Sequence, residues 1–224
     1  MPIDKIVVGT MREEVMRQDV MAQNLANVST SGYKRMLPFN DGGGFRTVLD
    51  RTQGTLSATG GAMHVSIKGD GGWFVLSSNG RQQLTRDGSF QMTADGTLTS
   101  ADGRPVQGRG GGDIKLDPRA PVDVGEDGSL HQNGQRVAQL LVVDPGAAAA
   151  LQPAGRASYE APGATFTPMN ATVTTGHVEM ANVNPMHEMT DYMMSMRSFE
   201  FGQKSLQIDN EIQRLLIRDV GRTK

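Results

Sequence analysis

Hydrophobic residues near the start of the chain follow the spacing of a helix that packs against another helix. The apolar positions within residues 3–28 are Val8, Met11, Val15, Ala22 and Leu25. Polar Gln18 stands at the position that this series skips. Such heptad spacing is typical of a helix–helix seam, in which one polar residue can fix register at some cost in stability. We therefore expect an amphipathic helix over residues 3–28, ending where Ser, Thr and Gly occupy residues 29–32.

A second and longer helix is predicted for the last part of the chain. Asn184 suits its N-cap, Pro185 its first position, and Glu188 falls within the electropositive first turn. We expect its packing face to consist of Met186, Met189, Met193, Met196, Phe199, Phe201, Ile208, Ile212 and Leu215. A helix of about 35 residues is roughly 50 Å long. Because a small domain cannot cover that length, we expect both helical ends to pack on other chains.

Between the two helices the periodicity changes. Residues 36–62 have no clear period and are rich in Gly, so we expect a connector with short strands at most. From residue 63 onward, short apolar runs with a period of two predict strands near residues 65–67, 73–76, 90–92, 98, 106, 114–116, 122–124 and 140–143. Asp-Gly and Asn-Gly pairs separate these runs, and such pairs favour tight hairpin turns because they tolerate positive φ.

The pairs that we expect at turns include Asp70-Gly71, Asp87-Gly88, Asp95-Gly96, Asp102-Gly103, Asp127-Gly128 and Asn133-Gly134. Prolines and glycines predict that residues 145–170 are irregular, and residues 173–180 are predicted to form one last strand.

The fold class that follows is α+β. Paired long N- and C-terminal helices, coiled-coil-like, flank a mostly antiparallel β domain, which is a sandwich or an open barrel. The predicted domains are a discontinuous helical assembly domain of residues 1–35 and 181–224, a connector over 36–62, and a β domain over 63–180. The predicted assembly interface consists of Val8, Met11, Val15, Ala22, Leu25, Met189, Met193, Met196, Phe199, Ile208, Ile212 and Leu215.

Composition argues against several classes of partner. The net charge is −2, so no basic face is available to neutralise nucleic-acid phosphates. The sequence contains no apolar run of 18 residues, and we expect no direct membrane insertion. The N-terminus lacks the basic region of a signal peptide. The absence of cysteine suits export through several redox environments but is also common in cytosolic proteins.

Candidate chemistry is sparse. The four histidines, His64, His131, His177 and His187, fit no zinc-ligand spacing. The Asp-Gly pairs lack the alternating ligands of a calcium loop, and no serine stands in a nucleophile-elbow pattern. We predict no catalytic residue, metal site, cofactor or small-molecule substrate. The methionines over residues 186–196 suit an adaptable binding surface or ordinary helix packing.

Two segments resemble a known family. Residues 24–34, Asn-Leu-Ala-Asn-Val-Ser-Thr-Ser-Gly-Tyr-Lys, are similar to the N-terminal signature of the bacterial flagellar axial proteins, which form the rod and hook. Residues 178–189 resemble the family's second signature, with Ala181-Asn182-Val183 followed by a helix that contains Glu and Met. Residues 65–75, 84–90, 96–98 and 103–106 follow the order of basal-body rod proteins. The Gly-Trp-Phe run at 72–74 resembles the proximal-rod type.

The resemblance implies a structural subunit of the flagellar rod that polymerises through its terminal helices and transmits torque. The implied partners are copies of itself, other rod proteins and the flagellar type III export apparatus, with the rod lying in the periplasm and export needing no cleaved signal. The residues implied to shape the signature turns are Asn24, Asn27, Gly32, Tyr33, Asn182 and Asn184. The alternatives are a distal-rod or hook subunit, and a secreted adhesin or carbohydrate-binding β domain with coiled-coil ends.

Overall fold

The chain divides into two compact units. A computed structural model describes residues 3–220 except 41, 43, 79 and 148. Unit 1 comprises Met1–Ala26, Met36–Val48 and Asn184–Lys224, and unit 2 comprises Asn27–Arg35 and Leu49–Val183. The signature segment that follows the first helix therefore belongs to unit 2, although the chain on both sides of it belongs to unit 1.

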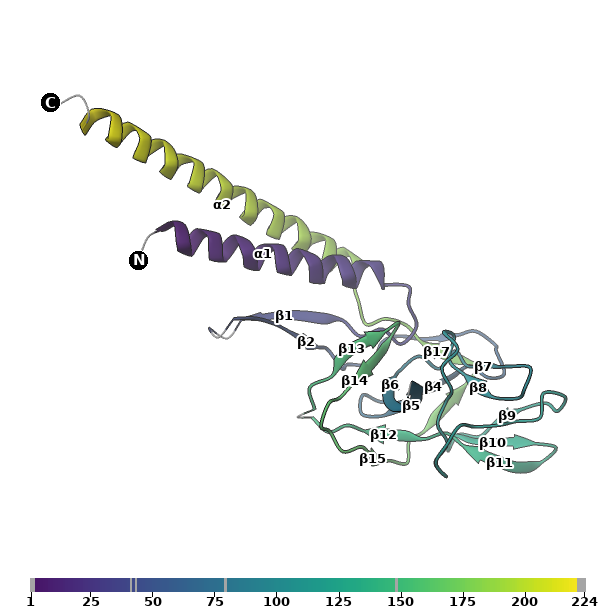
Figure 1. Cartoon of the computed structure of the whole chain (residues 1–224). Coiled ribbons are helices and arrows are strands. Elements are labelled where there is room, and N and C mark those ends of the chain that lie inside the picture. Colours follow the sequence, from purple (N-terminus) through teal and green to yellow (C-terminus); the bar gives the residue numbers. More distant parts are fainter. Residues whose placement is uncertain (1–2, 41, 43, 79, 148, 221–224) are drawn as a thin grey trace. The chain divides into compact units, whose positions relative to one another are not determined.

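Unit 1 contains two helices and a hairpin (Figure 1). Helix α1 spans Ile3–Ala26, and helix α2 spans Pro185–Val220. Strands β1 (Met36–Asn40) and β2 (Phe45–Leu49) form a two-stranded sheet. The α+β class and the long C-terminal helix are confirmed. The prediction of two long helices is wrong for the N-terminal one, which is a single helix of 24 residues against the 36 of α2.

The start of α2 follows from its capping residues. Asn184 Oδ1 accepts hydrogen bonds from the backbone N–H groups of Met186 (3.0 Å) and His187 (3.3 Å). The Asn184 carbonyl accepts the N–H of Glu188 at 3.1 Å. These bonds satisfy donors that the first helical turn leaves unpaired, and Pro185 has no N–H to satisfy. The expected N-cap is therefore present.

Unit 2 is built from short strands, and every pairing between its named strands is antiparallel. The strands, drawn in Figure 1, are β3 (Leu56–Ala58), β4 (Val65–Ile67), β5 (Trp73–Ser78), β6 (Arg81–Thr85), β7 (Gln91–Met92), β8 (Leu98–Thr99), β9 (Asp123–Val124), β10 (Ser129–Gln132), β11 (Gln135–Gln139), β12 (Val142–Asp144), β13 (Gln152–Gly155), β14 (Ser158–Glu160), β15 (Thr167–Pro168), β16 (Val173–Thr175) and β17 (His177–Glu179). The largest sheet has the order β13-β14-β6-β5-β12-β15. A mostly antiparallel β domain is thus confirmed.

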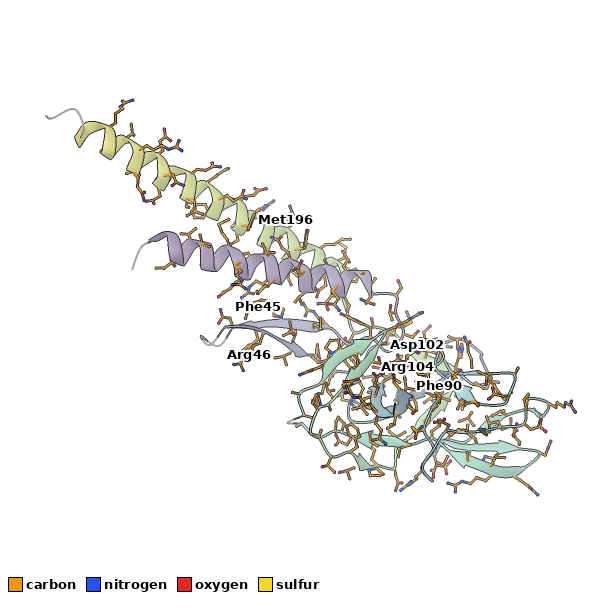
Figure 2. All side chains as sticks on the ribbon, viewed as in Figure 1. Phe45, Arg46, Phe90, Asp102, Arg104 and Met196 are labelled. Carbon is orange, nitrogen blue, oxygen red and sulfur yellow. The ribbon has the colours of Figure 1, made fainter. Side chains whose placement is uncertain are left out.

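Two clusters of buried side chains form the core of unit 2. The larger cluster includes Phe74 and Phe90, whose rings meet edge to face at 5.1 Å between centroids (Figure 2 labels Phe90). The smaller cluster is centred on Trp73 and Tyr159, which also meet edge to face, at 5.5 Å. Because successive residues of a strand point to opposite faces, Trp73 and Phe74 place β5 between the two clusters.

The expected turns form at most of the predicted Asp-Gly and Asn-Gly pairs. The glycines of four of these pairs have positive φ: Gly96, Gly103, Gly128 and Gly134. Gly88 and Gly71 are not among the residues with positive φ, so the prediction is wrong at both pairs. A Cβ atom on Gly88 would lie 1.7 Å from the carbonyl oxygen of Val65. Glycine is needed at position 88 because the Val65 backbone packs closely against it, and sequence spacing does not reveal such packing.

Two predictions for the later part of unit 2 are wrong. Residues 145–170 are not irregular, since they contain β13, β14 and β15. Pro153 is tolerated because β13 is an edge strand, where an N–H is not needed on the open side. The single strand predicted over 173–180 is two strands, because Gly176 (φ 68°) breaks it. Strand β16 pairs with β4, and β17 pairs with β3.

We predict that Gly88→Ala lowers the free energy of unfolding by about 2 kcal/mol or more, because the added methyl group must displace backbone. Urea unfolding of the full chain measures the change. Gly71→Ala is the matched control, since a Cβ there meets no atom within 4 Å and the residue lacks positive φ. Equal stability of the two variants would contradict the close approach at Gly88.

Candidate assembly interface

Within unit 1, α1 and α2 are in contact along a face that shares Met11 with the predicted seam. The Ser195 hydroxyl donates to Glu14 Oε2 at 2.6 Å. A Cβ on Gly202 would lie 2.9 Å from Met11 Cγ and 3.9 Å from Val7 Cγ1. Glycine at position 202 therefore allows the close approach. Val7, Met11 and Glu14 of α1 thus face α2, and Met11 is one of the predicted seam positions.

The structure places the predicted seam of α1 mostly in solvent. Val8, Val15 and Ala22 are exposed, and Met11 and Leu25 are partly buried. Seven-residue spacing keeps Val8, Val15 and Ala22 on one side of the helix. In place of these residues, α1 buries Val20, Met21 and Asn24. Gln18 has an amide nitrogen that is shielded from solvent and has no hydrogen-bond partner among the described residues.

The predicted apolar face of α2 is also open to solvent. The exposed members are Met186, Met189, Met193, Met196, Phe201, Ile208, Ile212 and Leu215. Phe199 is partly buried. Among the described residues, Val137 is the only large exposed hydrophobic residue that lies in unit 2; the others lie in unit 1. Apolar surface that is left in solvent at this density is typical of a surface that a partner covers.

One exposed stripe on α2 has strict heptad spacing, and sequence reasoning found it only in part. Its members are Met194, Phe201, Ile208 and Leu215, with exposed fractions of 62%, 74%, 59% and 49%. We call these four residues the α2 stripe. Met194 was missed because the neighbouring methionines at 189, 193 and 196 define a face of their own. The seven-residue interval back from Leu215 is the signal that could have identified it.

Asn24 joins three elements of unit 1. Its side chain accepts a hydrogen bond from the Met36 N–H at 2.9 Å and donates to the Met36 carbonyl at 2.8 Å. Its amide also donates to Glu188 Oε2 at 3.1 Å. Asn24 and Glu188 are each 1% exposed. The first signature residue thus connects α1 to β1 and to the first turn of α2, through buried bonds that are expensive to leave unmade.

In unit 2 the segment Gly32–Arg35 is held by residues from distant parts of the chain. Gly32 has φ of +69°, and a Cβ there would lie 2.1 Å from the backbone nitrogen of Asp87, so only glycine fits. The Gly32 N–H donates to the Glu179 carbonyl at 2.7 Å. Tyr33 is buried in a cluster with Ala157 and Val183. Asn27 accepts the N–H of Thr30 at 2.9 Å through its carbonyl, in the turn that precedes this segment.

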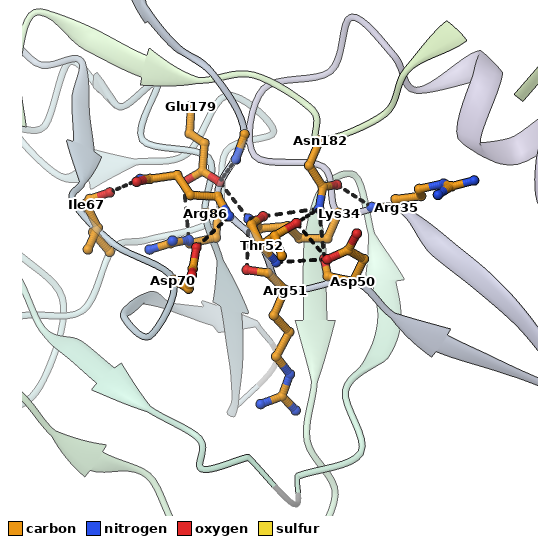
Figure 3. A network of polar contacts seen from close by, with 12 residues as sticks. Lys34, Arg35, Asp50, Arg51, Thr52, Ile67, Asp70, Arg86, Glu179 and Asn182 are labelled. Carbon is orange, nitrogen blue, oxygen red and sulfur yellow. Dashed lines mark hydrogen bonds and ion pairs between the residues drawn. The ribbon is translucent and has the colours of Figure 1, made fainter. Parts of the chain in front are cut away.

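Lys34 and Glu179 form a fully buried ion pair (Figure 3). The two charged atoms lie 2.6 Å apart, and the side chains are 0% and 1% exposed. The Lys34 ammonium group also donates to the carbonyl oxygens of Arg51 and Thr52. Burial lowers the pKa of Lys34, and the nearby Glu179 carboxylate opposes that shift.

Glu179 serves a second buried cation. Its Oε2 lies 3.2 Å from Arg86 Nε, which is close enough for an ion pair but is not aligned as a hydrogen bond. The Arg86 guanidinium also donates to the carbonyls of Gly72 (2.7 Å) and Gly69, and it lies 5.9 Å from the centre of the Trp73 ring. Burial lowers the pKa of Arg86, and Glu179 opposes this effect. Glu179 therefore gives the larger compensation of two buried cations, and the Asp70 carboxylate adds a smaller one to both.

Tyr159 and Asn182 complete this network. The Lys34 N–H donates to the Tyr159 hydroxyl at 2.8 Å, and burial raises the pKa of Tyr159. Asn182 Oδ1 accepts the Arg35 N–H at 2.7 Å, while its amide donates to the Asp50 carbonyl at 3.0 Å. The structure thus brings Gly32, Tyr33 and Asn182 together in unit 2, while Asn24 and Asn184 belong to unit 1.

The charged residues of this network were missed as functional residues. Lys34 and Glu179 lie inside the signature segments, but a charged residue in a sequence is ordinarily read as solvated. Arg86 lies far from both signatures. A second ion pair of unit 2, Asp102 with Arg104, is more exposed (Figure 2). Burial works against ionisation of Asp102, yet hydrogen bonds from Arg104 and Ser100 hold its pKa below the usual value.

Neither described helix has the length and apolar character needed to cross a membrane. The described residues also contain no group of three or more His, Asp or Glu that could hold a metal ion.

Comparison with known proteins identifies related sequences in three parts of the chain. Residues 7–34 match the family "Flagella basal body rod protein", residues 66–145 match "Flagellar hook protein FlgE/F/G D1 domain", and residues 174–218 match "Flagellar basal body rod FlgEFG protein C-terminal". The Lys34 and Glu179 partners fall in the first and last of these matches.

Three relatives are each described as the flagellar basal-body rod protein FlgF. The protein of Mesorhizobium japonicum is 36% identical over 82% of this chain and 83% of its own length. That of Rhizobium meliloti is 32% identical over 82% of this chain and 83% of its own length. That of Caulobacter vibrioides is 30% identical over 97% of this chain and 98% of its own length.

We predict that Glu179→Gln destabilises unit 2 by about 3–5 kcal/mol, because it leaves two buried cations without their shared carboxylate. Lys34→Met should cost less, since Glu179 and Arg86 then remain as a neutral pair. Urea unfolding of the full chain gives both values. Glu126→Gln, the same change at an exposed position, is the control. A larger loss of unfolding free energy for Lys34→Met than for Glu179→Gln would contradict the conclusion that Glu179 compensates two cations.

Proposed function

This chain belongs to the flagellar basal-body rod protein family, and we propose that within the rod it is a proximal-rod subunit that polymerises through its terminal helices. It is a structural subunit of the bacterial flagellar basal body. The family membership implies that it is not an enzyme. A rod subunit of this kind carries torque from the motor toward the hook.

One observation carries the proposal of helical polymerisation. The large exposed hydrophobic residues of the described chain are gathered on unit 1, and the α2 stripe has the seven-residue period of a helix–helix seam. Fully burying a side chain such as Phe or Ile contributes about 1.5–3 kcal/mol. Burial of four such residues in one stripe therefore favours association substantially. In the isolated chain these side chains stay in solvent, so this free energy is not gained.

The terminal helices are proposed to pair in a coiled-coil-like manner and to pack against those of neighbouring subunits. In this arrangement unit 1 is the assembly domain. The sequence-based bounds of that domain were residues 1–35 and 181–224, but residues 27–35 belong to unit 2. Exposed positions of the α1 seam and the α2 stripe are the proposed contact residues. The unpaired Gln18 amide suits a polar position that fixes register at some cost in stability.

The proposed partners are copies of this chain, other rod proteins and the flagellar type III export apparatus. The proposed location is the periplasmic part of the rod, reached without a cleaved signal peptide. A secreted carbohydrate-binding function has little support, because sugar stacking needs an accessible aromatic face and Trp73 is 1% exposed. Counting subunits in purified basal bodies distinguishes the proposed proximal position, with few copies, from the distal rod, with many.

We predict that the double substitution Phe201→Glu and Ile208→Glu abolishes incorporation into basal bodies, because carboxylates in a helix seam lose apolar burial and must be desolvated. The measurement is swimming motility together with recovery of the chain in purified basal bodies, in a strain that lacks the native copy. We expect at least a tenfold loss of recovered chain.

The control is Val137→Glu, which places one carboxylate on the large exposed hydrophobic residue of unit 2 among the described residues. Circular dichroism should show that both variants keep their secondary structure. Normal motility of the double variant, or an equal loss for Val137→Glu, would contradict assembly through the α2 stripe.

A further inference from the structure

The segment Gly32–Arg35 binds to the rest of unit 2 through residues that lie much later in the chain. It lies between α1 and β1, which both belong to unit 1, yet its own bonds are made within unit 2. We call Gly32–Arg35 the latch segment. Its partners come from three later parts of the chain: residues 50–52, Tyr159, and residues 179–182.

The backbone of the latch segment is bonded to distant partners at three of its four residues. The Gly32 N–H donates to the Glu179 carbonyl, the Lys34 N–H to the Tyr159 hydroxyl, and the Arg35 N–H to Asn182 Oδ1. The Arg35 carbonyl in turn accepts the Asp50 N–H at 2.8 Å. A backbone that is satisfied in this way by partners distant in sequence can dock only as a whole.

The charge of Lys34 makes this docking conditional. Lys34 is completely buried, and its carboxylate partner lies 145 residues later in the chain. A buried ammonium group without a carboxylate is strongly disfavoured, so the latch segment does not dock favourably until Glu179 is in place. Glu179 Oε1 also accepts the Gly54 N–H at 3.0 Å, which links the segment beyond Thr52 to the same carboxylate.

We propose that the latch segment docks cooperatively on unit 2, and that it does so only when the segment around Glu179–Asn182 is in place. When the C-terminal signature is present and docked, the N-terminal signature is held on unit 2. When the C-terminal signature is absent or undocked, the N-terminal signature is not held there. Arg35, Asp50 and Asn182 are joined by hydrogen bonds (Figure 3), so docking of the latch segment fixes all three together. This device belongs to the isolated chain and does not depend on polymerisation.

Native-state hydrogen exchange of the wild-type full chain tests the latch. Exchange is followed by NMR at increasing urea concentrations below the unfolding transition. The amides of Gly32, Lys34, Arg35 and Gly54 should share a single opening event that is at least about tenfold more populated than the opening of paired β5 and β6 amides. Independent opening of these four amides, or exchange only with global unfolding, would overturn the proposal.

The variants separate the latch from general destabilisation. Glu179→Gln should raise exchange of the four latch amides by at least tenfold more than it raises exchange of the β5 and β6 amides. The double variant Lys34→Met with Glu179→Gln should recover part of this protection, since it removes one of the two unpaired cations. Asn182→Ala, a milder change, should open the same four amides together if Glu179→Gln fails to fold.

Arg104→Met is the control for losing an ion-pair cation elsewhere in unit 2. It should leave the ratio of latch to β5–β6 exchange unchanged. A change of that ratio equal to the one for Glu179→Gln would overturn the proposal. Because all of these measurements use the unassembled chain, a failed latch and a failed assembly function are recognised separately.

Discussion

The Glu179 carboxylate is the single group on which much of unit 2 depends. It compensates two cations, Lys34 and Arg86, that are as deeply buried as the aromatic core. Removing two cations and a carboxylate from water is costly, and the cost is offset only when the geometry is well satisfied. Here backbone carbonyls of Gly72, Arg51 and Thr52 supply the remaining acceptors. A buried network of this kind favours one arrangement of the chain over alternatives, which suits a segment that must be placed in a fixed register.

The two units differ in how far they bury their hydrophobic residues. Unit 2 buries its hydrophobic residues around Phe74 and Trp73 and is nearly free of exposed apolar side chains among the described residues. Unit 1 leaves both helices largely uncovered, with Phe201 and Ile208 in solvent. A helix stabilised only by its own hydrogen bonds is marginal in water, since most helical stability in proteins comes from packing of the apolar face. The stability of unit 1 is therefore expected to rise in the proposed assembly, in which neighbouring subunits cover these helices.

Much of the secondary structure could be predicted, and the failures have physical causes. The helix beginning at Pro185 followed from the Asn184 cap, and the turn at Gly128 from its Asp-Gly pair. The strand β14 was missed because the neighbouring Pro153 was read as a break, although an edge strand tolerates proline. The contact between α1 and α2 includes Val7 beside the predicted Met11, because Gly202 allows the two helices to approach closely at this point.

By itself the sequence determined that two terminal helices flank a region of short strands, the apolar periodicity of both helices and the two signatures that identify the family. These are local properties, since they depend on spacing, capping and turn residues within a few positions. Only the tertiary structure decided that Gly32–Arg35 belongs to unit 2, that Lys34 meets Glu179, and that Gly88 is needed for close packing rather than for a turn. These facts arise from contacts between residues far apart in the chain. A single sequence carries no spacing from which such contacts, or the burial of a charge, can be read.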